Sequence, residues 1–178
     1  MSFLFNEEPK IRELAVRIWF DFDGSISPMF KLKQKTDKKG DRLYTYTQIQ
    51  FECEIYLAET NPYLVKDLLA LCSSLGLNGR IAHDKRKWSG IGGVCISNLN
   101  SVKKFVKMGP ITDICVSAKS SRFRGVKKMD VCKAVHSLLG SDLPRSRYFT
   151  DKQDAITVRK DLNRVLEDKI RRDYSPVV

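Results

Sequence analysis

Residues 6–22 show apolar positions that recur with the period of an α-helix. Six apolar side chains are spaced three or four residues apart, which places them on one continuous helical face. They are Ile11, Leu14, Ala15, Ile18, Trp19 and Phe22. Asn6 is a suitable N-cap, and Gly24 is suited to stop the helix. The pattern therefore predicts a helix over residues 6–22.

The apolar period changes to two after Gly24, which is typical of a strand with one buried face. Over residues 26–35, apolar side chains fall on one side, and Lys31, Lys33 and Lys35 fall on the other. A polar turn around Gly40 follows. The next strand has apolar residues at odd positions and polar residues at even ones. The odd positions are Ile49, Phe51, Cys53, Ile55 and Leu57, and the even ones include Gln48, Gln50, Glu52 and Glu54. These segments predict a sheet with one apolar and one polar face.

The remaining segments continue the mixture of helical and strand patterns. We expect a helix over 61–76 capped by Asn61, strands over 79–84 and 93–98, a helix over 98–109, and helices over 126–139 and 150–173. Residues 111–119 fit either an extra strand or an irregular crossing. The predicted fold is α+β, in the order αββαββα with an antiparallel four-stranded sheet and additional C-terminal helices. We expect a core domain over 1–140 and a C-terminal helical extension over 141–178.

The charge balance points to a polyanionic partner. The chain has 178 residues and a formal net charge of +11, a basic excess that is most often associated with nucleic acid and sometimes with an acidic membrane surface. The alternative is a basic protein that avoids aggregation by self-repulsion. No apolar run approaches the roughly 20 residues of a membrane span, so we expect no membrane partner. Five scattered cysteines without a CxxC pair, and only two histidines, predict free thiols, no zinc cluster and an intracellular location.

The stretch VRIWFDFDGSI (residues 16–26) carries the candidate chemistry. Phosphatases of the haloacid dehalogenase type share its hydrophobic-D-x-D-G-[ST] pattern, with Asp21 as nucleophile and Asp23 as acid/base. That chemistry needs residues 16–22 to form a strand among parallel neighbours, whereas the downstream pattern is hairpin, helix, hairpin. A second alternative is that both aspartates are solvated turn-formers.

The same stretch resembles the motif of the LAGLIDADG homing endonucleases, and the resemblance extends from residue 11 to about 140. Its layout is similar to that family's αββαββα unit, and LLALCSSLGLNGRIAHD (residues 68–84) resembles its helix, glycine turn and third strand. The resemblance implies a helix that ends on Asp23. Two carboxylates in the last turn of a helix are disfavoured by its dipole unless a cation is nearby.

By the resemblance, Asp23 binds Mg²⁺ or another divalent cation with its carboxylate, and the main-chain carbonyl of Phe22 assists. It further implies a polar residue near the end of the second strand, matched by Thr60 or Asn61, and a lysine, matched by Lys127. These residues are candidates for holding the water and the scissile phosphate. One motif copy implies a homodimer, with helices packed around residues 11–22 and a near-palindromic target. Family members usually have small residues where the helices cross, whereas this chain has Arg17, Ile18 and Phe22.

The predicted function is divalent-metal-dependent, site-specific cleavage of double-stranded DNA. The polar sheet face is the expected DNA surface, because its first strand presents only cations and because amides and cations suit base edges and phosphates. The predicted DNA-binding residues are Lys31, Lys33, Lys35, Gln48, Gln50, Lys85, Arg86, Lys87, Arg122 and Arg124. The alternative to this surface is an ordinary solvated sheet face. The alternative function is a DNA- or RNA-binding regulator or maturase on the same scaffold, without cleavage.

Overall fold

The computed structural model describes residues 8–118, 121–140 and 146–174, which form an α+β fold with an antiparallel sheet. The helices are α1 (Pro9–Asp23), α2 (Pro62–Ser74), α3 (Leu99–Met108), α4 (Lys128–Gly140) and α5 (Lys152–Tyr174). The strands are β1 (Gly24–Lys39), β2 (Arg42–Ala58), β3 (Gly79–His83), β4 (Ile91–Ile96) and β5 (Ser146–Phe149). The first seven elements, α1 to α3, follow the order expected from the sequence.

The sheet is built on a long antiparallel hairpin of β1 and β2. Gly24 lies opposite Leu57 at one end of the hairpin, and Lys39 lies opposite Arg42 at the other. The strand order is β1-β2-β4-β3, and β5 pairs with β2 beyond the end of β4. The sheet therefore has five strands among the described residues, and the expectation of four was wrong. The fifth strand falls in the segment for which we expected only helix.

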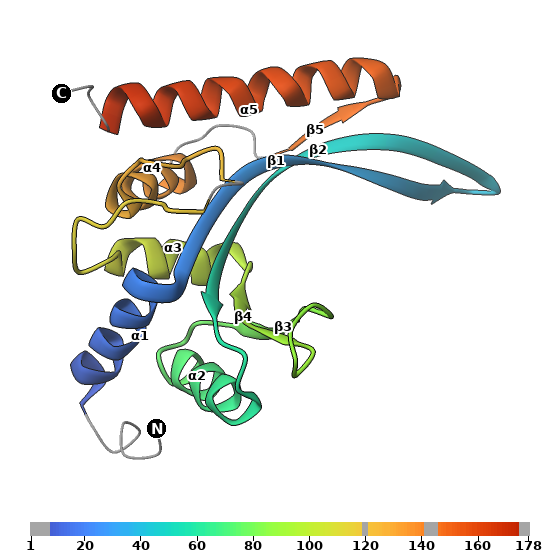
Figure 1. Ribbon diagram of the computed structural model, residues 1–178. Helices are drawn as coiled ribbons and strands as arrows, with labels where there is room; N and C mark the ends of the chain where they lie inside the picture. Colours follow the sequence, from blue (N-terminus) through green and yellow to red (C-terminus); the bar gives the residue numbers. More distant parts are fainter. Residues whose placement is uncertain (1–7, 119–120, 141–145, 175–178) are drawn as a thin grey trace.

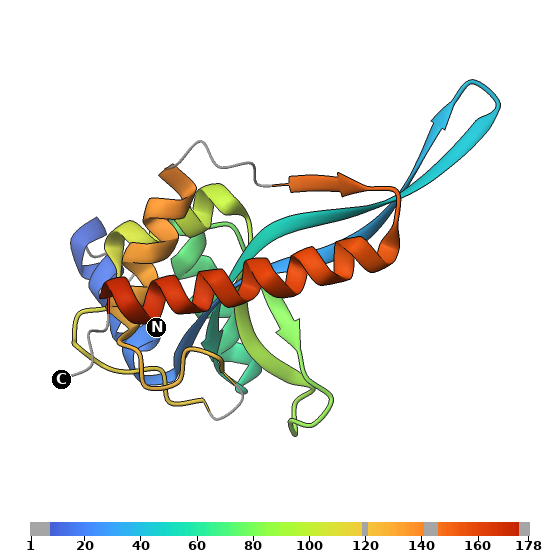
Figure 2. The same cartoon turned by 90° about the horizontal axis from the view of Figure 1, so that it is seen from above.

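The period-two pattern places the apolar side chains of β2 on the helix-covered face. Phe51, Cys53, Ile55 and Leu57 are buried in the main hydrophobic core, together with side chains from all five helices. Figure 1 shows the β1–β2 hairpin arching away from α1, with α3, α4 and α5 on one side of the arch. Viewed from above, α5 runs alongside the hairpin, and the hairpin tip projects beyond the rest of the molecule (Figure 2). The polar face of the sheet lies on the other side of the arch.

The boundaries of α1 differ slightly from the expectation. The helix begins at Pro9 with Glu8 as N-cap, and Asn6, the expected cap, lies outside the described residues. At the other end the helix includes Asp23. Gly24 then has an extended backbone, with φ −94° and ψ 155°. A Cβ at Gly24 would lie 2.5 Å from the Cα of Phe20, so glycine is required here by close approach of the backbone.

Helix α1 has apolar side chains on two sides. Val16 and Phe20 are fully buried in the core, and Ala15 and Trp19 pack against it. Four residues of the face identified from the sequence instead remain exposed to solvent. They are Ile11 (42%), Leu14 (45%), Ile18 (44%) and Phe22 (76%). We call these four residues the α1 stripe, and they leave an apolar surface that the described part of the chain does not cover.

The segment between α3 and α4 is an irregular crossing. Its described residues include one isolated bridge, between Cys115 and Lys127, and no strand. Helix α4 begins at Lys128, two residues later than expected. Helix α5 contributes Leu166 and Ile170 to the same core as the first 140 residues. Among the described helices, none combines the length and apolar character that crossing a membrane requires.

Candidate nucleic-acid interface and candidate metal site

The two aspartates at the end of α1 have opposite environments. Asp21 is 3% exposed, and its carboxylate accepts hydrogen bonds from the main-chain N–H of Ile111, at 3.2 Å, and of Thr112, at 3.0 Å. The hydroxyl of Thr112 also donates to Asp21, at 3.0 Å. Asp23 is exposed and forms no hydrogen bond or ion pair with any residue that the structure describes. Asp21 therefore fixes the crossing segment to the helix end, and Asp23 remains available for an external ligand.

This arrangement does not support the phosphatase interpretation. Residues 16–22 lie within α1, and the strand that follows them is part of an antiparallel hairpin. A nucleophilic aspartate of the haloacid dehalogenase type would instead follow a strand with parallel neighbours. The carboxylate of Asp21 is also occupied by its three donors. The alternative in which both aspartates are solvated is wrong for Asp21, because it is buried.

A buried lysine neutralises the C-terminal end of α1. The Nζ of Lys128 donates to the main-chain carbonyls of Phe20, at 2.6 Å, and of Asp21, at 2.9 Å. It also lies 5.0 Å from the centre of the Phe20 ring. Burial lowers the pKa of Lys128, and the negative charges of Asp21 and Asp23 oppose that shift without cancelling it. The ammonium thus offsets the negative end of the helix dipole and satisfies two of its terminal carbonyls.

The sequence indicated that a cation was needed at this helix end but not that Lys128 supplies one. The sequence pattern indicated no role for Lys128, and its neighbour Lys127 was the lysine that matched the family pattern. In the structure, Lys127 is exposed and forms an ion pair with Asp113, at 2.7 Å. This hydrogen bond raises the pKa of Lys127. Because Asp113 follows Thr112, Lys127 remains close to the end of α1.

The residues at the end of α1 fit a divalent cation only in part. Asp23 offers an exposed carboxylate, and the main-chain carbonyl of Phe22 lies one residue beyond those bound by Lys128. A hard divalent cation takes about six oxygen ligands, usually including several carboxylates or waters. Within the described residues, no group of three His, Cys, Asp or Glu side chains gathers around a common point. The described end of α1 therefore offers a single exposed carboxylate, that of Asp23.

The end of β2 lies next to this helix end. Gly24 pairs with Leu57, and the indole N–H of Trp19 donates to the carbonyl of Ala58, at 3.0 Å. Thr60 and Asn61 follow Ala58 by two and three residues, so both candidates are near the end of α1. However, the side chain of Asn61 is engaged as the N-cap of α2, where it accepts from two main-chain N–H groups. The main-chain carbonyl of Thr60 accepts a hydrogen bond from the hydroxyl of Ser89, at 2.5 Å.

The polar face of the sheet is less cationic than the sequence of its first strand indicated. Lys31 forms ion pairs with Glu52, at 3.0 Å, and Glu54, at 3.1 Å, and Lys33 pairs with Glu52, at 2.5 Å. Partial burial raises the pKa of the Glu52 carboxyl, but hydrogen bonds from Lys33 and Lys31 outweigh it and hold the pKa below its usual value. Two of the three predicted lysines are thus neutralised by β2, and Lys35 is exposed.

The distal half of this face combines amides, aromatic rings and cations. Strand register aligns Lys33, Gln48 and Tyr148 in one row across β1, β2 and β5. In the neighbouring row, Lys35 lies opposite Tyr46, whose ring contacts that of Tyr148 edge-on at 5.4 Å. Tyr148 is 64% exposed. The sequence did not predict a role for Tyr148, because nothing in a four-residue strand indicates its pairing with β2.

The other predicted DNA-binding residues lie at separate sites. At the tip between β3 and β4, Arg86 pairs with Asp84, at 2.9 Å, and the hydrogen bond from Arg86 lowers the pKa of Asp84 to about 2. Lys85 and Lys87 are exposed on the same tip. Arg122 and Arg124 lie in the crossing segment, and Arg122 lines a groove at the edge of β1 rather than the middle of the polar face. The structure therefore does not gather all predicted cations on one surface.

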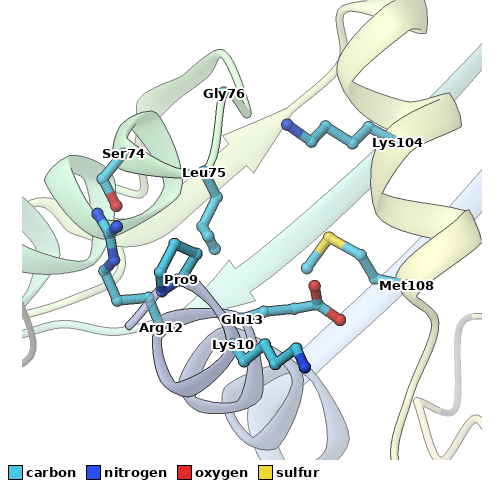
Figure 3. Close-up of a pocket in the computed structure, with 9 residues that line it drawn as sticks. All are labelled: Pro9, Lys10, Arg12, Glu13, Ser74, Leu75, Gly76, Lys104 and Met108. Atoms are coloured by element: carbon cyan, nitrogen blue, oxygen red, sulfur yellow. The ribbon is translucent and has the colours of Figure 1, made fainter. Parts of the chain in front are cut away.

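A separate pocket lies at the opposite end of α1. Figure 3 shows Arg12 directed toward Ser74 and Lys104 directed toward Gly76, both at the end of α2. These cations face the C-terminal end of a helix, where positive charge is stabilising. The pocket contains one carboxylate, that of Glu13, and no pair of groups suited to acid–base or nucleophilic chemistry. We assign this pocket no role in the candidate site.

No family model, curated protein or solved structure matches the chain.

Proposed function

We propose that this chain is a LAGLIDADG-type endonuclease that binds double-stranded DNA on the polar face of its sheet and cleaves it as a homodimer. The observation that carries the proposal is the α1 stripe, an exposed apolar helix face that ends next to the exposed carboxylate of Asp23. The element order from α1 to α3 and the open polar face further support it.

The α1 stripe is suited to pairing with a second copy. Its members are spaced by three, four and four residues, so they form one continuous face. The opposite side of the helix is already buried through Val16 and Phe20. Two-fold pairing along the stripe is self-complementary, and a two-fold axis that runs roughly along the helices brings the Asp23 ends of both protomers toward each other. The proposed dimer then supplies two Asp23 carboxylates, where one chain supplies one.

The α1 stripe consists of large side chains, whereas the family usually has small residues where its two helices cross closely. Arg17, expected at this crossing, instead donates to the carbonyls of Gly109, at 3.0 Å, and Pro110, at 3.1 Å, so its charge is directed toward the end of α3. Ile18 and Phe22 remain on the exposed side. These bulky side chains imply a wider separation of the two helices than small residues would give.

In the proposed site, Asp23 and the carbonyl of Phe22 hold Mg²⁺ or another divalent cation. Such a cation lowers the pKa of a bound water and stabilises charge on a scissile phosphate. Lys128 keeps the two preceding carbonyls satisfied and offsets the charge of Asp21. Lys127 is the exposed cation beside this end of the helix, and Thr60 lies at the adjoining end of β2.

A second candidate function is nucleic-acid binding without cleavage, by a regulator or maturase. Lys128 favours it, because this ammonium already provides the positive charge that the end of α1 requires. The helix end is therefore compatible with a stable fold that holds no metal ion. Both candidates predict the same salt-sensitive binding to the polar face and differ only in cleavage.

Replacement of Asp23 by Asn separates the two candidates. For an endonuclease, wild-type protein with Mg²⁺ cuts a pool of random-sequence duplexes, and Asp23→Asn abolishes cutting while binding persists. Asp168→Asn, at an exposed carboxylate on α5, is the matched control and should cut like wild type. Cutting by Asp23→Asn at the wild-type rate would contradict the assigned role. Binding by wild-type protein without cutting, under any divalent cation, would favour the second candidate.

A further inference from the structure

The outer edge of β1 is closed by α5 and by the segment before α4. Asn163 of α5 pairs with the main chain of Phe30: its side-chain oxygen accepts from the N–H, at 2.9 Å, and its Nδ2 donates to the carbonyl, at 3.0 Å. The side-chain amide of Asn163 thus satisfies the main-chain groups of the edge strand β1 that a neighbouring strand would otherwise bind. The guanidinium of Arg171 donates to the carbonyl of Arg122, which fixes the crossing segment to α5. These three elements therefore form a preorganised groove.

The groove is strongly basic. The charged side chains that line it are Lys31, Arg122, Arg159, Lys160, Arg164 and Glu167. Glu167 pairs with Arg171, and Arg164 pairs with Asp161.

Three cations of the groove have no carboxylate partner. Arg122, Arg159 and Lys160 form no ion pair with any residue in the described part of the chain. The Nε of Arg159 is, in addition, buried without a hydrogen-bond partner among these residues. An unsatisfied buried donor on a cation is costly, and an anionic oxygen at the guanidinium would compensate for that cost electrostatically. The groove is therefore complementary to an anion that the chain does not itself provide.

The groove opens onto the polar face of the sheet. Lys31 belongs to the polar face of β1, and it also lines the groove. The major groove of B-DNA is about 12 Å wide and admits a two-stranded ribbon, whose edges then face the two phosphate backbones. A duplex that receives the β1–β2 hairpin in its major groove thus has one backbone along the outer edge of β1. That edge is where the unpaired cations lie.

We propose that this groove binds the phosphodiester backbone of the DNA duplex on the sheet, with Arg159 and Lys160 as its main contacts. The inference rests on the proposed DNA binding and extends the DNA surface to α5. The planar guanidinium of Arg159 is suited to two oxygens of one phosphate, and Lys160 contributes a point charge. These contacts are independent of base sequence, so they set the position of the duplex and its affinity.

Affinity for a random-sequence duplex, measured over a range of salt concentrations without divalent metal, tests the groove. Each phosphate that the protein no longer neutralises reduces the slope of log K against log[salt] by about 0.9, so Arg159→Gln/Lys160→Gln should reduce the slope by about 1.8. Lys169→Gln/Arg172→Gln removes the same charges from exposed positions of α5 outside the groove and should leave the slope unchanged. Lys160→Gln alone should lower the slope by about 0.9, which covers the case in which replacement of Arg159 unfolds the protein.

The outcomes separate the groove from the proposed function. A wild-type affinity that does not depend on salt would overturn DNA binding altogether, and the groove with it. Salt-dependent binding by wild type, with an unchanged slope in the groove variants, would overturn the groove alone. An equal reduction of the slope in the control variant would attribute the effect to net charge and would also overturn the groove.

Discussion

The last turns of α1 have an inward side, whose groups are packed and hydrogen-bonded within the chain, and an outward side, whose groups are left exposed. On the inward side, Phe20 is buried, Asp21 has three hydrogen-bond donors, and Lys128 binds the helix carbonyls. On the outward side, Ile18 and Phe22 are exposed apolar residues. Asp23, the last residue of the helix, is also exposed and is a carboxylate without a hydrogen bond or ion pair to any described residue.

Within this single helix, the inward groups therefore contribute to the stability of the fold, and the outward groups are the ones suited to bind another molecule. The inward groups gain little from a second molecule, because packing and hydrogen bonds within the chain already satisfy them. The outward groups have an exposed apolar surface and a free charge, which are the features of an interface and a ligand site. Substitutions on the two sides should therefore affect different measurements.

The largest expected effect comes from the outward side, through Ile18→Glu. Fully burying an isoleucine side chain contributes about 1.5–3 kcal/mol, but Ile18 is already partly buried, at 44% exposed in the single chain, so each copy gains about half of that at a two-fold interface. The variant also places two glutamate charges in the same interface, so we expect the dissociation constant of the dimer to rise by roughly 100-fold or more. Sedimentation velocity over a concentration series measures this change. Chemical denaturation of the variant should show a folded protein.

Val165→Glu is the control for this substitution, because Val165 is 59% exposed but lies on α5. It should leave the dissociation constant unchanged. A wild-type protein that is monomeric at all accessible concentrations would contradict the proposed role of the α1 stripe. A dimer that Ile18→Glu leaves intact would place the interface elsewhere.

The next effect concerns the inward side, through Lys128→Met. Methionine fills a similar volume but leaves the carbonyls of Phe20 and Asp21 without their donor. Hydrogen bonds to charged groups contribute about 1.5–3 kcal/mol, so we expect the free energy of unfolding to fall by about 2–3 kcal/mol. Urea denaturation measures it. The exposed neighbour provides the control, because Lys127→Met should leave the denaturation midpoint nearly unchanged. If both substitutions lowered the denaturation midpoint equally, the proposed role of Lys128 in stabilising the end of α1 would be contradicted.

The fold was predictable where periodicity extended over many residues. The alternation in β2 and the helical spacing in α1 correctly indicated the element types, because each pattern repeats along more than ten residues. Strand β5 was missed because it has four residues and depends on pairing with a segment about 100 positions earlier. The periodicity of α1 also could not distinguish which apolar side faces the core, since both sides are apolar.

The candidate site was predictable only for the position of Asp23 at the helix end. The partners of Asp21 lie about 90 positions away, in a segment with no regular structure. Lys127 and Lys128 are adjacent, and only the start of α4 determines which one is buried. The pairing of Lys31 with Glu52 depends on the hairpin register, and a shift by one residue would direct these side chains to opposite faces.

The smallest expected effect on stability comes from Glu52→Gln, which removes the carboxylate that pairs with Lys31 and Lys33 on the polar face. Glu52 is partly exposed, so solvent screens its pairs with Lys31 and Lys33, and the free energy of unfolding should change by less than about 1 kcal/mol. Because the pKa of Glu52 is lowered in the folded protein, its contribution is present above the unfolded pKa. It disappears as the pH falls through the folded pKa.

The functional effect of Glu52→Gln should exceed its effect on stability. Without this carboxylate, Lys33 has no ion-pair partner among the described residues, and Lys31 keeps only Glu54 there, so the polar face becomes more cationic. If DNA lies on this face, the affinity for a random-sequence duplex should rise, and its salt dependence should become steeper. Glu167→Gln removes a carboxylate from α5 and tests whether charge at the groove acts in the same way. If the affinity of Glu52→Gln were unchanged, duplex DNA would not contact this part of the sheet. DNA bound there would be attracted more strongly once the negative charge of Glu52 is removed.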